Sequence, residues 1–343
     1  MDHGLIGILH NVPLAPGSAF SEASRDVLDQ VEAIEKALGE LGRPAVRVPF
    51  SRDPGEPVKA IRDRNVMMVF NLCETVDEDP RLCGHPAAVL ELVGIPFSGS
   101  PSSALTLSTD KWVAKQLLDA AGIPTPAYVL HGSTSPLESV GLRYPVIVKP
   151  RFEDASIGID QDSIFRDEGE LRGGILSFSR RFGDVLIEEY IDGREFNVSA
   201  FGYPNAFVLP VAEIDFSGFP DDLYRIVGYR AKWKRDSVEF RHTLRVFPET
   251  LKPSVASEIE KLTARCFNLF MLRDYGRIDF RMDGRGNVYV LEVNANPCLS
   301  PDAGFAAAME RSGINYRSMV DQLVSFMVLR NGRIDRSITT PPR

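Results

Sequence analysis

The sequence lacks the features that mark several broad classes of protein. No run of about 18 apolar residues occurs and the first residues show no signal-peptide pattern, so we expect neither a membrane partner nor secretion. The four cysteines have no metal-ligand spacing, which argues against zinc and favours a reduced, cytoplasmic protein. The formal net charge of −8 argues against nucleic acid and anionic membranes as partners.

What remains is an ordinary globular composition on a chain long enough for two or three domains. The chain has 343 residues, of which 44% are hydrophobic and 25% are charged. Over residues 1–105, apolar runs at 5–9, 46–48 and 66–71 alternate with helical patterns, which predicts a parallel sheet with crossover helices. Glu22 and the acids of 74–79 follow strand ends, where such sheets bind ligands, although surface loops would show the same pattern.

The middle of the chain carries a lysine in an unusual place. The run 144–150 reads as an apolar strand that ends at Lys149 and Pro150. Since lysine is rarely buried without a partner, we expect Lys149 to meet an anion. The polar loop 151–158, with Ser156 near its tip, could fold over phosphates through backbone N–H groups.

The next segments are compatible with more than one use. Residues 185–191 read as a strand that turns at Asp192-Gly193, and its edge could hold an adenine ring or form a plain hairpin. The basic stretch 225–245 could be a solvated face, or could hold phosphates or an acidic substrate. Helical patterns cover 249–272, 304–316 and 319–329, and we expect residues 331–343 to form a loose tail.

The strongest single signal is the stretch 276–297, which reads as two alternating strands around Asp283-Gly284-Arg285-Gly286. Two-residue and four-residue loops give the same register, in which Arg277 opposes Glu292. Because side chains alternate between faces, one face carries Arg277, Asp279, Glu292 and Asn294, and the other, which looks like core, carries Ile278, Phe280, Leu291 and Val293. Two close carboxylates repel unless a cation lies between them, and hard oxygen ligands suit Mg²⁺ or Mn²⁺. A solvated polar face would show the same alternation.

Six motifs follow one another along the chain. They are E-L-V-G-I-P-F-S-G-S (91–100), D-K-W-V-A-K-Q-L-L-D-A-A-G-I-P-T-P (110–126), Y-P-V-I-V-K-P (144–150), V-L-I-E-E-Y-I-D-G-R-E-F (185–196), Y-R-A-K-W (229–233) and the hairpin with L-E-V-N-A-N-P (291–297). In their order and spacing, these motifs resemble the ATP-grasp ligases and most closely the D-alanine–D-alanine ligases. The resemblance implies an α/β protein in which an N-terminal parallel-sheet domain (1–105) precedes two α+β ATP-grasp subdomains (106–190 and 191–330).

The resemblance also implies a role for individual residues. ATP would lie between the two subdomains with two Mg²⁺ ions, and the loop that holds Ser156 would close over an acyl phosphate and exclude water. Lys111 and Lys149 would hold the α- and β-phosphates, Lys232 the γ-phosphate, Glu188 with the backbone of Glu189 and Ile191 the adenine, Glu195 the ribose, and Asp279, Glu292 and Asn294 the metal ions, with Arg277 facing the acyl phosphate.

Departures from the family pattern fall on the amino-acid side. Ala155 stands where the family has a serine, and Trp233 where it has a tyrosine; Glu22 is a loose match for the glutamate that completes that triad. The family's H-G-x-x-G-E-D-G motif near the first substrate corresponds to residues 73–80, which lack the histidine but keep Glu78. After the asparagine at position 294 the family reads T-x-P-G-M-T, whereas this chain reads A-N-P-C-L-S and so places Cys298 there. Glu22, Glu78, Trp233 and Cys298 are therefore the residues we expect to contact a changed substrate.

Three hypotheses follow. The preferred one is an ATP-dependent ligase that joins a carboxylate to an amino acid or amine through an acyl phosphate, releasing ADP and phosphate. The second is true D-alanine–D-alanine ligation with a divergent pocket. The third is a nucleotide-binding regulatory protein that has lost catalysis. Against it argues the retention of six residues, Lys149, Lys232, Arg277, Asp279, Glu292 and Asn294. A homodimer through the first domain would suit the family.

Overall fold

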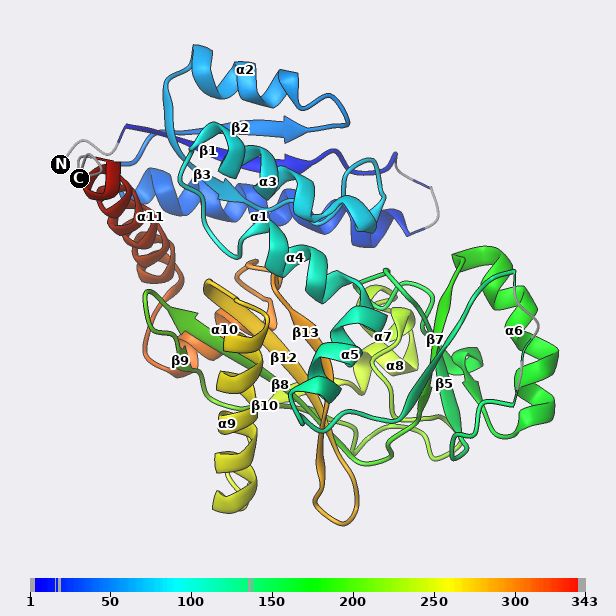
Figure 1. The fold of residues 1–343 in the computed structure, drawn as a ribbon. Coiled ribbons are helices and arrows are strands. Elements are labelled where there is room, and N and C mark those ends of the chain that lie inside the picture. The colour runs from blue at the N-terminus through cyan, green and yellow to red at the C-terminus, as the bar shows by residue number, and fades with distance from the viewer. Residues whose placement is uncertain (1–3, 16, 18–19, 135–136, 138, 339–343) are drawn as a thin grey trace, which may run out of the picture.

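The computed structural model contains three β-sheets and describes residues 4–15, 17, 20–134, 137 and 139–338, with side chains described as far as residue 331. Figure 1 shows the N-terminal sheet in blue, the central sheet in green, and the C-terminal sheet running from green through yellow to orange. Within the described residues no helix is long and apolar enough to cross a bilayer.

The N-terminal sheet is parallel, as the alternation of apolar runs and helical patterns predicts. Its order is β2-β1-β3; helix α1 joins the neighbouring strands β1 and β2, and α2 joins β2 to β3 on the other side of β1. After Pro96 the chain adds only a single parallel bridge to this sheet, between Val69 and Phe97. The elements are β1 (Leu5–Asn11), α1 (Ser21–Glu40), β2 (Ala45–Phe50), α2 (Gly55–Asp63), β3 (Val66–Asn71), a 3₁₀ turn (Pro80–Leu82) and α3 (Gly84–Val93).

The central sheet is antiparallel, with the order β4-β7-β5-β6, and α6 packs on it. Asp110 caps the helix that leads into it, because its side chain accepts hydrogen bonds from the backbone N–H groups of Trp112 and Val113. The elements are α4 (Ser102–Thr109), α5 (Lys111–Ala120), β4 (Tyr128–His131), β5 (Val146–Pro150), a 3₁₀ turn (Gln161–Ser163), β6 (Ile164–Phe165), α6 (Glu168–Phe182) and β7 (Val185–Glu189).

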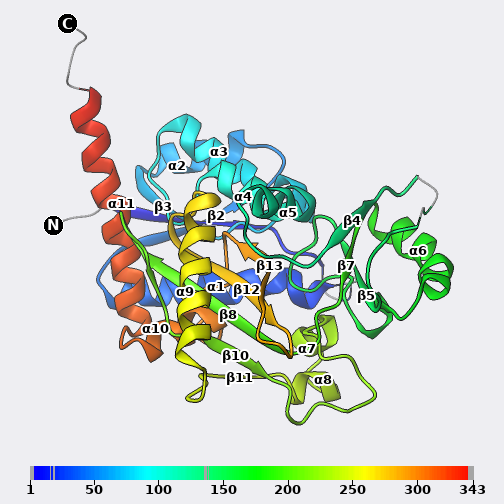
Figure 2. The same ribbon diagram turned by 60° about the horizontal axis from the view of Figure 1, so that its bottom comes forward.

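The C-terminal sheet has the order β11-β10-β8-β12-β13, with β9 paired to β8, and α9 covers one of its faces (Figure 2). The expected loose tail is wrong for residues 331–338, which continue the last helix; residues 339–343 lie outside the described part. The elements are β8 (Arg194–Gly202), β9 (Phe207–Val208), β10 (Ala212–Asp215), α7 (Tyr229–Trp233), α8 (Val238–Arg241), β11 (Leu244–Val246), α9 (Pro253–Leu269), β12 (Asp274–Met282), β13 (Val288–Asn294), α10 (Gly304–Arg311) and α11 (Tyr316–Ile338).

The β12–β13 hairpin forms, but its predicted register is wrong by two residues. Met282 opposes Val288, so the loop is longer than the two or four residues expected, and Arg277 opposes Asn294 instead of Glu292. A β-bulge then adds one more residue on β13. The longer loop and the bulge together shift the register by two residues, an even number, so Asp279 and Glu292 stay on one face as predicted and now lie opposite each other.

Leu291 is the extra residue of the bulge, and its predicted place in the core is therefore wrong. Phe280 pairs with Val290 and Asp279 pairs with Glu292, which leaves Leu291 without an opposite residue. Consecutive strand residues usually point to opposite faces, yet Leu291 and Glu292 line the same cavity. Ile278, Phe280 and Val293 are buried against α9, as expected.

A buried ion pair joins the last helix to the sheet and to the N-terminal domain. The Arg330 guanidinium lies 2.5 and 3.0 Å from the two carboxylate oxygens of Asp274, and it also donates to the carbonyl of Phe97. Asp274 accepts a further bond of 2.9 Å from the N–H of Gly99. Asp274 is fully buried, so removal of the Arg330 side chain would leave the Asp274 carboxylate as a buried charge without its counter-ion.

We therefore expect Arg330→Met to lower the free energy of unfolding by about 3–5 kcal/mol, because the Asp274 carboxylate would stay buried without its counter-ion. Urea unfolding followed by circular dichroism measures this change. Arg317→Met, at an exposed position of the same helix, is the matched control and should change the midpoint little. A loss below about 1 kcal/mol for Arg330→Met would contradict this role.

Candidate active site

A cavity between the central and C-terminal sheets brings together residues that are far apart in the sequence. Its lining includes most of the residues expected to bind nucleotide and metal: Lys111, Lys149, Ser156, Glu188, Glu189, Ile191, Glu195, Lys232, Arg277, Asp279 and Glu292. Five expected site residues lie outside this lining: Glu22, Glu78, Trp233, Asn294 and Cys298. The side-chain Oδ1 of Asn294 instead accepts a hydrogen bond of 2.9 Å from the N–H of Asn296.

The floor of the cavity is the polar face of the hairpin. Arg277 binds Asp279 through two parallel bonds, Nε to Oδ1 at 2.8 Å and an Nη to Oδ2 at 2.9 Å. Asn197 on β8 donates a further bond of 2.9 Å to Asp279 Oδ1. The negative charge of Asp279 and its neighbours raises the pKa of Arg277 against the effect of burial, so this guanidinium stays charged.

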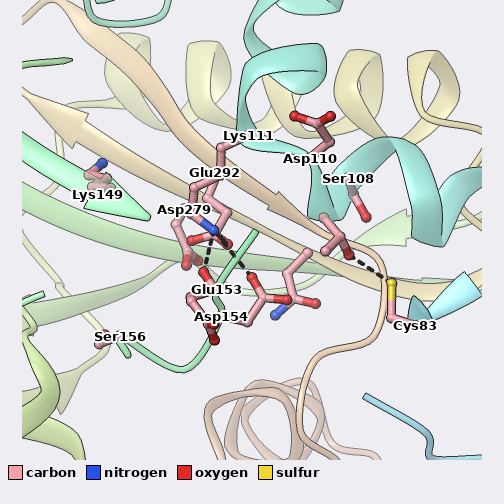
Figure 3. Close-up of polar contacts among 12 residues, drawn as sticks. Cys83, Ser108, Asp110, Lys111, Lys149, Glu153, Asp154, Ser156, Asp279 and Glu292 are labelled. Carbon is pink, nitrogen blue, oxygen red and sulfur yellow. Dashed lines mark hydrogen bonds and ion pairs between the residues drawn. The ribbon is translucent and has the colours of Figure 1, made fainter. Parts of the chain in front are cut away.

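Lys111, the first residue of α5, holds the Glu292 end of this face (Figure 3). Its ammonium lies 3.3 Å from Glu292, 3.4 Å from Asp154 and 2.6 Å from the backbone carbonyl of Glu153. Burial alone would raise the pKa of Glu292, but the charge of Lys111, a hydrogen bond with Asp154 and the charges of Lys232 and Arg277 lower it well below its usual value. Glu292 is therefore a carboxylate at neutral pH, as a metal ligand must be.

A second group of charged side chains lies around Glu188, on β7 in the cavity wall. Glu188, only 1% exposed, lies 2.9 Å from the Lys149 ammonium and 3.4 Å from that of Lys115. Burial would raise the pKa of Glu188, but the two ammonium groups lower it. Lys149 thus has a buried anionic partner, and the two cations on one carboxylate leave net positive charge at this side of the cavity.

Lys115 belongs to this group although the sequence analysis does not single it out. It is 2% exposed and donates to the Thr125 hydroxyl at 2.6 Å. Burial and the nearby Lys149 lower the pKa of Lys115 to about 8, against the pull of Glu188. Its spacing of four residues after Lys111 is the available signal, because residues four apart lie on one face of a helix such as α5.

Arg281 and Asn197 are also site residues that the sequence analysis leaves out. Arg281 is buried at the far end of the cavity, 2.8 Å from Glu195, and it donates to the backbone carbonyls of Gly193 and Arg225. Period-two alternation could have found both, since Arg281 follows Asp279 by two residues on β12 and Asn197 follows Glu195 by two on β8.

Helix α7 and the loop 151–158 close one side of the cavity. Ser156 donates from Oγ to the carbonyl of Val227 at 2.7 Å, and the Trp233 indole donates to the carbonyl of Ala155 at 2.9 Å. Lys232, between these contacts, lines the cavity, and burial with the nearby Arg277 lowers its pKa. Both contacts use a backbone carbonyl as the acceptor. The bond from Trp233 therefore does not depend on which side chain stands at position 155.

Glu22 reaches the same closing segment from the N-terminal domain. Its carboxylate accepts bonds from the Tyr229 hydroxyl at 3.1 Å and from the Lys234 ammonium at 2.6 Å. The Phe20 and Tyr229 rings pack edge to face with centroids 5.0 Å apart. Glu22 thus contacts Tyr229, four residues before Trp233, the residue at the family's tyrosine position.

Next to the cavity, acids of the N-terminal domain gather around Gln30. Its amide donates to Glu74 at 2.9 Å and to Asp26 at 3.4 Å, while its oxygen accepts from the N–H of Leu299. Cys298 lies 3.2 Å from Asp26, so this expected substrate residue meets an acid that the sequence analysis does not single out. Burial, with added negative charge from Asp26, raises the pKa of Glu74 to about 7. Glu78 lies at the edge of this group and accepts from Ser24 at 2.8 Å.

The residues present fit a metal that is bound largely by a nucleotide. Among the described residues no three His, Cys, Asp or Glu side chains form a cluster that could hold a metal ion by itself. The hairpin offers two carboxylates on one face beside a wall of ammonium groups. Mg²⁺ suits such a site, because it is bound by one or two carboxylates while phosphates and water complete its shell.

Known proteins share this sequence and fold. Residues 117–325 match the family model described as D-ala D-ala ligase C-terminus. An uncharacterized protein of Sinorhizobium fredii is 30% identical over 259 residues, covering 75% of this chain and 73% of the relative. D-alanine–D-alanine ligase B of Chromobacterium violaceum is 30% identical over 275 residues, covering 78% of this chain and 82% of the relative.

A solved structure gives the same fold over nearly the whole chain. The D-alanine–D-alanine ligase of Bacillus anthracis, in a complex with ATP, superposes with a TM-score of 0.76 at 20% identity, covering 96% of this chain and 99% of that one. The ATP-grasp fold expected from the motifs is therefore confirmed. The chain belongs to the D-alanine–D-alanine ligase family of ATP-grasp enzymes, which are ATP-dependent ligases that join a carboxylate to an amine.

Proposed function

We propose that this protein forms a dipeptide-like amide between a carboxylate and an amino acid or amine, through an acyl phosphate, with release of ADP and phosphate. The observation that carries the proposal is the meeting of Lys111, Lys149, Lys232 and Arg277 with Asp279 and Glu292 around one cavity. Such a set of cations and carboxylates suits the transfer of a phosphoryl group, whose charge must be neutralised as it moves.

ATP would occupy the cavity with its adenine against β7. The backbone of Glu189 and Ile191, together with Glu188, would hold the adenine, and Glu195 would bind the ribose. Glu188 is also the buried partner of Lys149, so it fixes the ammonium group that would meet a phosphate.

The phosphates would then point toward the hairpin. Lys111 and Lys149 would hold the α- and β-phosphates, and Lys232 would reach the γ-phosphate. Asp279, Glu292 and Asn294 would hold two Mg²⁺ or Mn²⁺ ions, which when bound neutralise charge on the phosphates. The bulge at Leu291 supports this assignment, because it keeps Glu292 on the face of Asp279.

Phosphorylation turns a poor electrophile into a good one. A free carboxylate would have to expel oxide, whereas an acyl phosphate expels phosphate when an amine attacks. Arg277 would stabilise the negative oxygen of the tetrahedral intermediate, since its guanidinium stays charged in the cavity. The loop that holds Ser156 is anchored over the cavity and would limit access of water to the acyl phosphate.

The substrates would differ from two D-alanines. Ala155 and Trp233 leave no hydroxyls for the family's triad, and their contact runs through a backbone carbonyl. The acids around Gln30 replace a region where the family has a histidine, and Cys298 contributes a thiol to it. Glu22, Glu78, Trp233 and Cys298 would shape the pocket indirectly, through the segments they hold.

The proposed function also bears on the domains, the compartment and the oligomeric state of the protein. The domains would be 1–105, 106–190 and 191–330, and the last two would move relative to each other as nucleotide binds and leaves. The four cysteines are unpaired, which suits a reducing cytoplasm. A homodimer through the N-terminal domain stays a prediction.

We expect Glu292→Gln to lower substrate-dependent ADP release by about a hundredfold or more while the protein stays folded, because the amide would be a poor metal ligand. A coupled assay of ADP release and circular dichroism measure the two effects. Glu310→Gln, an exposed glutamate on α10, serves as the control. Turnover of Glu292→Gln near the wild-type rate would exclude the metal assignment.

We expect the wild-type enzyme to release little ADP with D-alanine alone, and Ala155→Ser not to change this, since Trp233 would still lack the tyrosine hydroxyl. A pooled amino-acid screen, scored by ADP release with mass detection of products, checks both statements. Rapid formation of D-alanyl-D-alanine by the wild type would instead favour the second hypothesis, a true D-alanine–D-alanine ligase.

The raised pKa of Glu74 predicts how stability depends on pH. The folded protein holds a proton on Glu74 up to about pH 7, whereas the unfolded chain releases it near 4.5, so the free energy of unfolding falls between these values by up to about 3 kcal/mol. Glu74→Gln should remove this part of the fall, measured by urea unfolding at pH 5 and pH 8. Glu249→Gln, at an exposed position, should keep it. An unchanged slope in Glu74→Gln would contradict the shift.

A further inference from the structure

Asp154 occupies a position beside Lys111 that the nucleotide would need. Its Oδ1 lies 3.4 Å from the Lys111 ammonium, whose other acceptors are Glu292 and the carbonyl of Glu153 (Figure 3).

The ammonium of Lys111 has no spare donor in this arrangement. A lysine ammonium offers three N–H groups, and three acceptors surround that of Lys111, which is 8% exposed. A phosphate oxygen can therefore bind Lys111 with full strength only by replacing one of the three acceptors.

Asp154 is the acceptor that can leave. The Glu153 carbonyl is part of the backbone and makes the shortest contact, at 2.6 Å. The Glu292 side chain is 31% exposed and belongs to the β13 strand, whereas the Asp154 side chain is 47% exposed and makes the longest contact, at 3.4 Å. Rotation of one half-exposed side chain into solvent would free the donor without moving the backbone.

The loop around Asp154 is held in place, so the exchange involves the side chain alone. Ala155 and Ser156 both have left-handed backbone conformations, with φ of 53° and 60°. The carbonyl of Ala155 accepts from Trp233 and the hydroxyl of Ser156 donates to Val227, which ties the loop to the segment that precedes and forms α7. The loop therefore keeps the Asp154 backbone beside Lys111 whether or not the carboxylate stays on the ammonium.

We propose that Asp154 is a built-in counter-ion of Lys111 that the nucleotide phosphates displace, so that its carboxylate weakens nucleotide binding and speeds ADP release. The proposal rests on the proposed binding of ATP in this cavity. With the cavity empty, the carboxylate completes the hydrogen bonds of a buried cation. With phosphates present, the ionised carboxylate is a like charge beside them and a competitor for their donor. Burial and the neighbouring Glu292 raise the pKa of Asp154 to about 7, so binding is compared at pH 8, where this carboxylate is ionised.

The test is the affinity for nucleotide of a variant that lacks the charge. Asp154→Asn keeps the size of the side chain, and it should lower the Kd for a non-hydrolysable ATP analogue about two- to fivefold, the range expected for a half-exposed ion pair. Isothermal titration calorimetry measures the Kd with Mg²⁺ and without carboxylate or amine substrate. The same gain should appear for ADP without divalent ions, and stopped-flow release of a fluorescent ADP should be slower.

Glu153→Gln is the matched control, because it removes a neighbouring negative charge of the same loop but keeps the carbonyl that contacts Lys111. It should tighten binding less than Asp154→Asn. In a Lys111→Met background, the gain from Asp154→Asn should fall to that of the control, since the contested donor is gone.

An unchanged or higher Kd for Asp154→Asn would overturn the proposal. A loss of affinity seen only with Mg²⁺ would overturn it in favour of Asp154 as a metal ligand. If the analogue binds the wild type and only the predicted gain is missing, the proposed function survives and this inference fails. If the wild type binds no analogue, both fail.

Discussion

Opposite charges meet over one face of the β12–β13 hairpin, and much of the structure serves to hold them there. Arg277 neutralises Asp279, and Lys111 neutralises Glu292, at distances between 2.8 and 3.3 Å. Partly buried charges are costly unless they are paired, so each of these groups depends on its neighbour. The arrangement leaves a concave surface that can exchange internal partners for the phosphates and metal ions of a nucleotide.

The fold supplies the rigidity that such a surface needs. The opposite face of the hairpin packs Ile278, Phe280 and Val293 into the core under α9. The buried Asp274–Arg330 pair ties the start of β12 to the last helix and to the N-terminal domain. Bulge geometry at Leu291 then sets which side chains of β13 face the cavity.

The sequence predicted the parts of the site that depend on short-range periodicity. The shared face of Arg277, Asp279 and Glu292 follows from alternation. It is correct although the predicted register is wrong, because the longer loop and the bulge together shift the pairing by two residues, an even number. Loop length and bulges depend on local backbone geometry that alternation does not encode, so Leu291 was misplaced. The contacts of Asp154 with Lys111 and of Cys298 with Asp26 join distant segments, and no periodicity reports them.

The charged face of the hairpin would bind metal together with nucleotide. Titration of Mn²⁺ into the protein with a non-hydrolysable ATP analogue, followed by electron paramagnetic resonance of the free ion, measures this binding. The wild type should bind Mn²⁺ in a nucleotide-dependent manner, and Asp279→Asn should lose at least one of the ions. Equal Mn²⁺ binding by the two proteins would show that Asp279 is not a metal ligand.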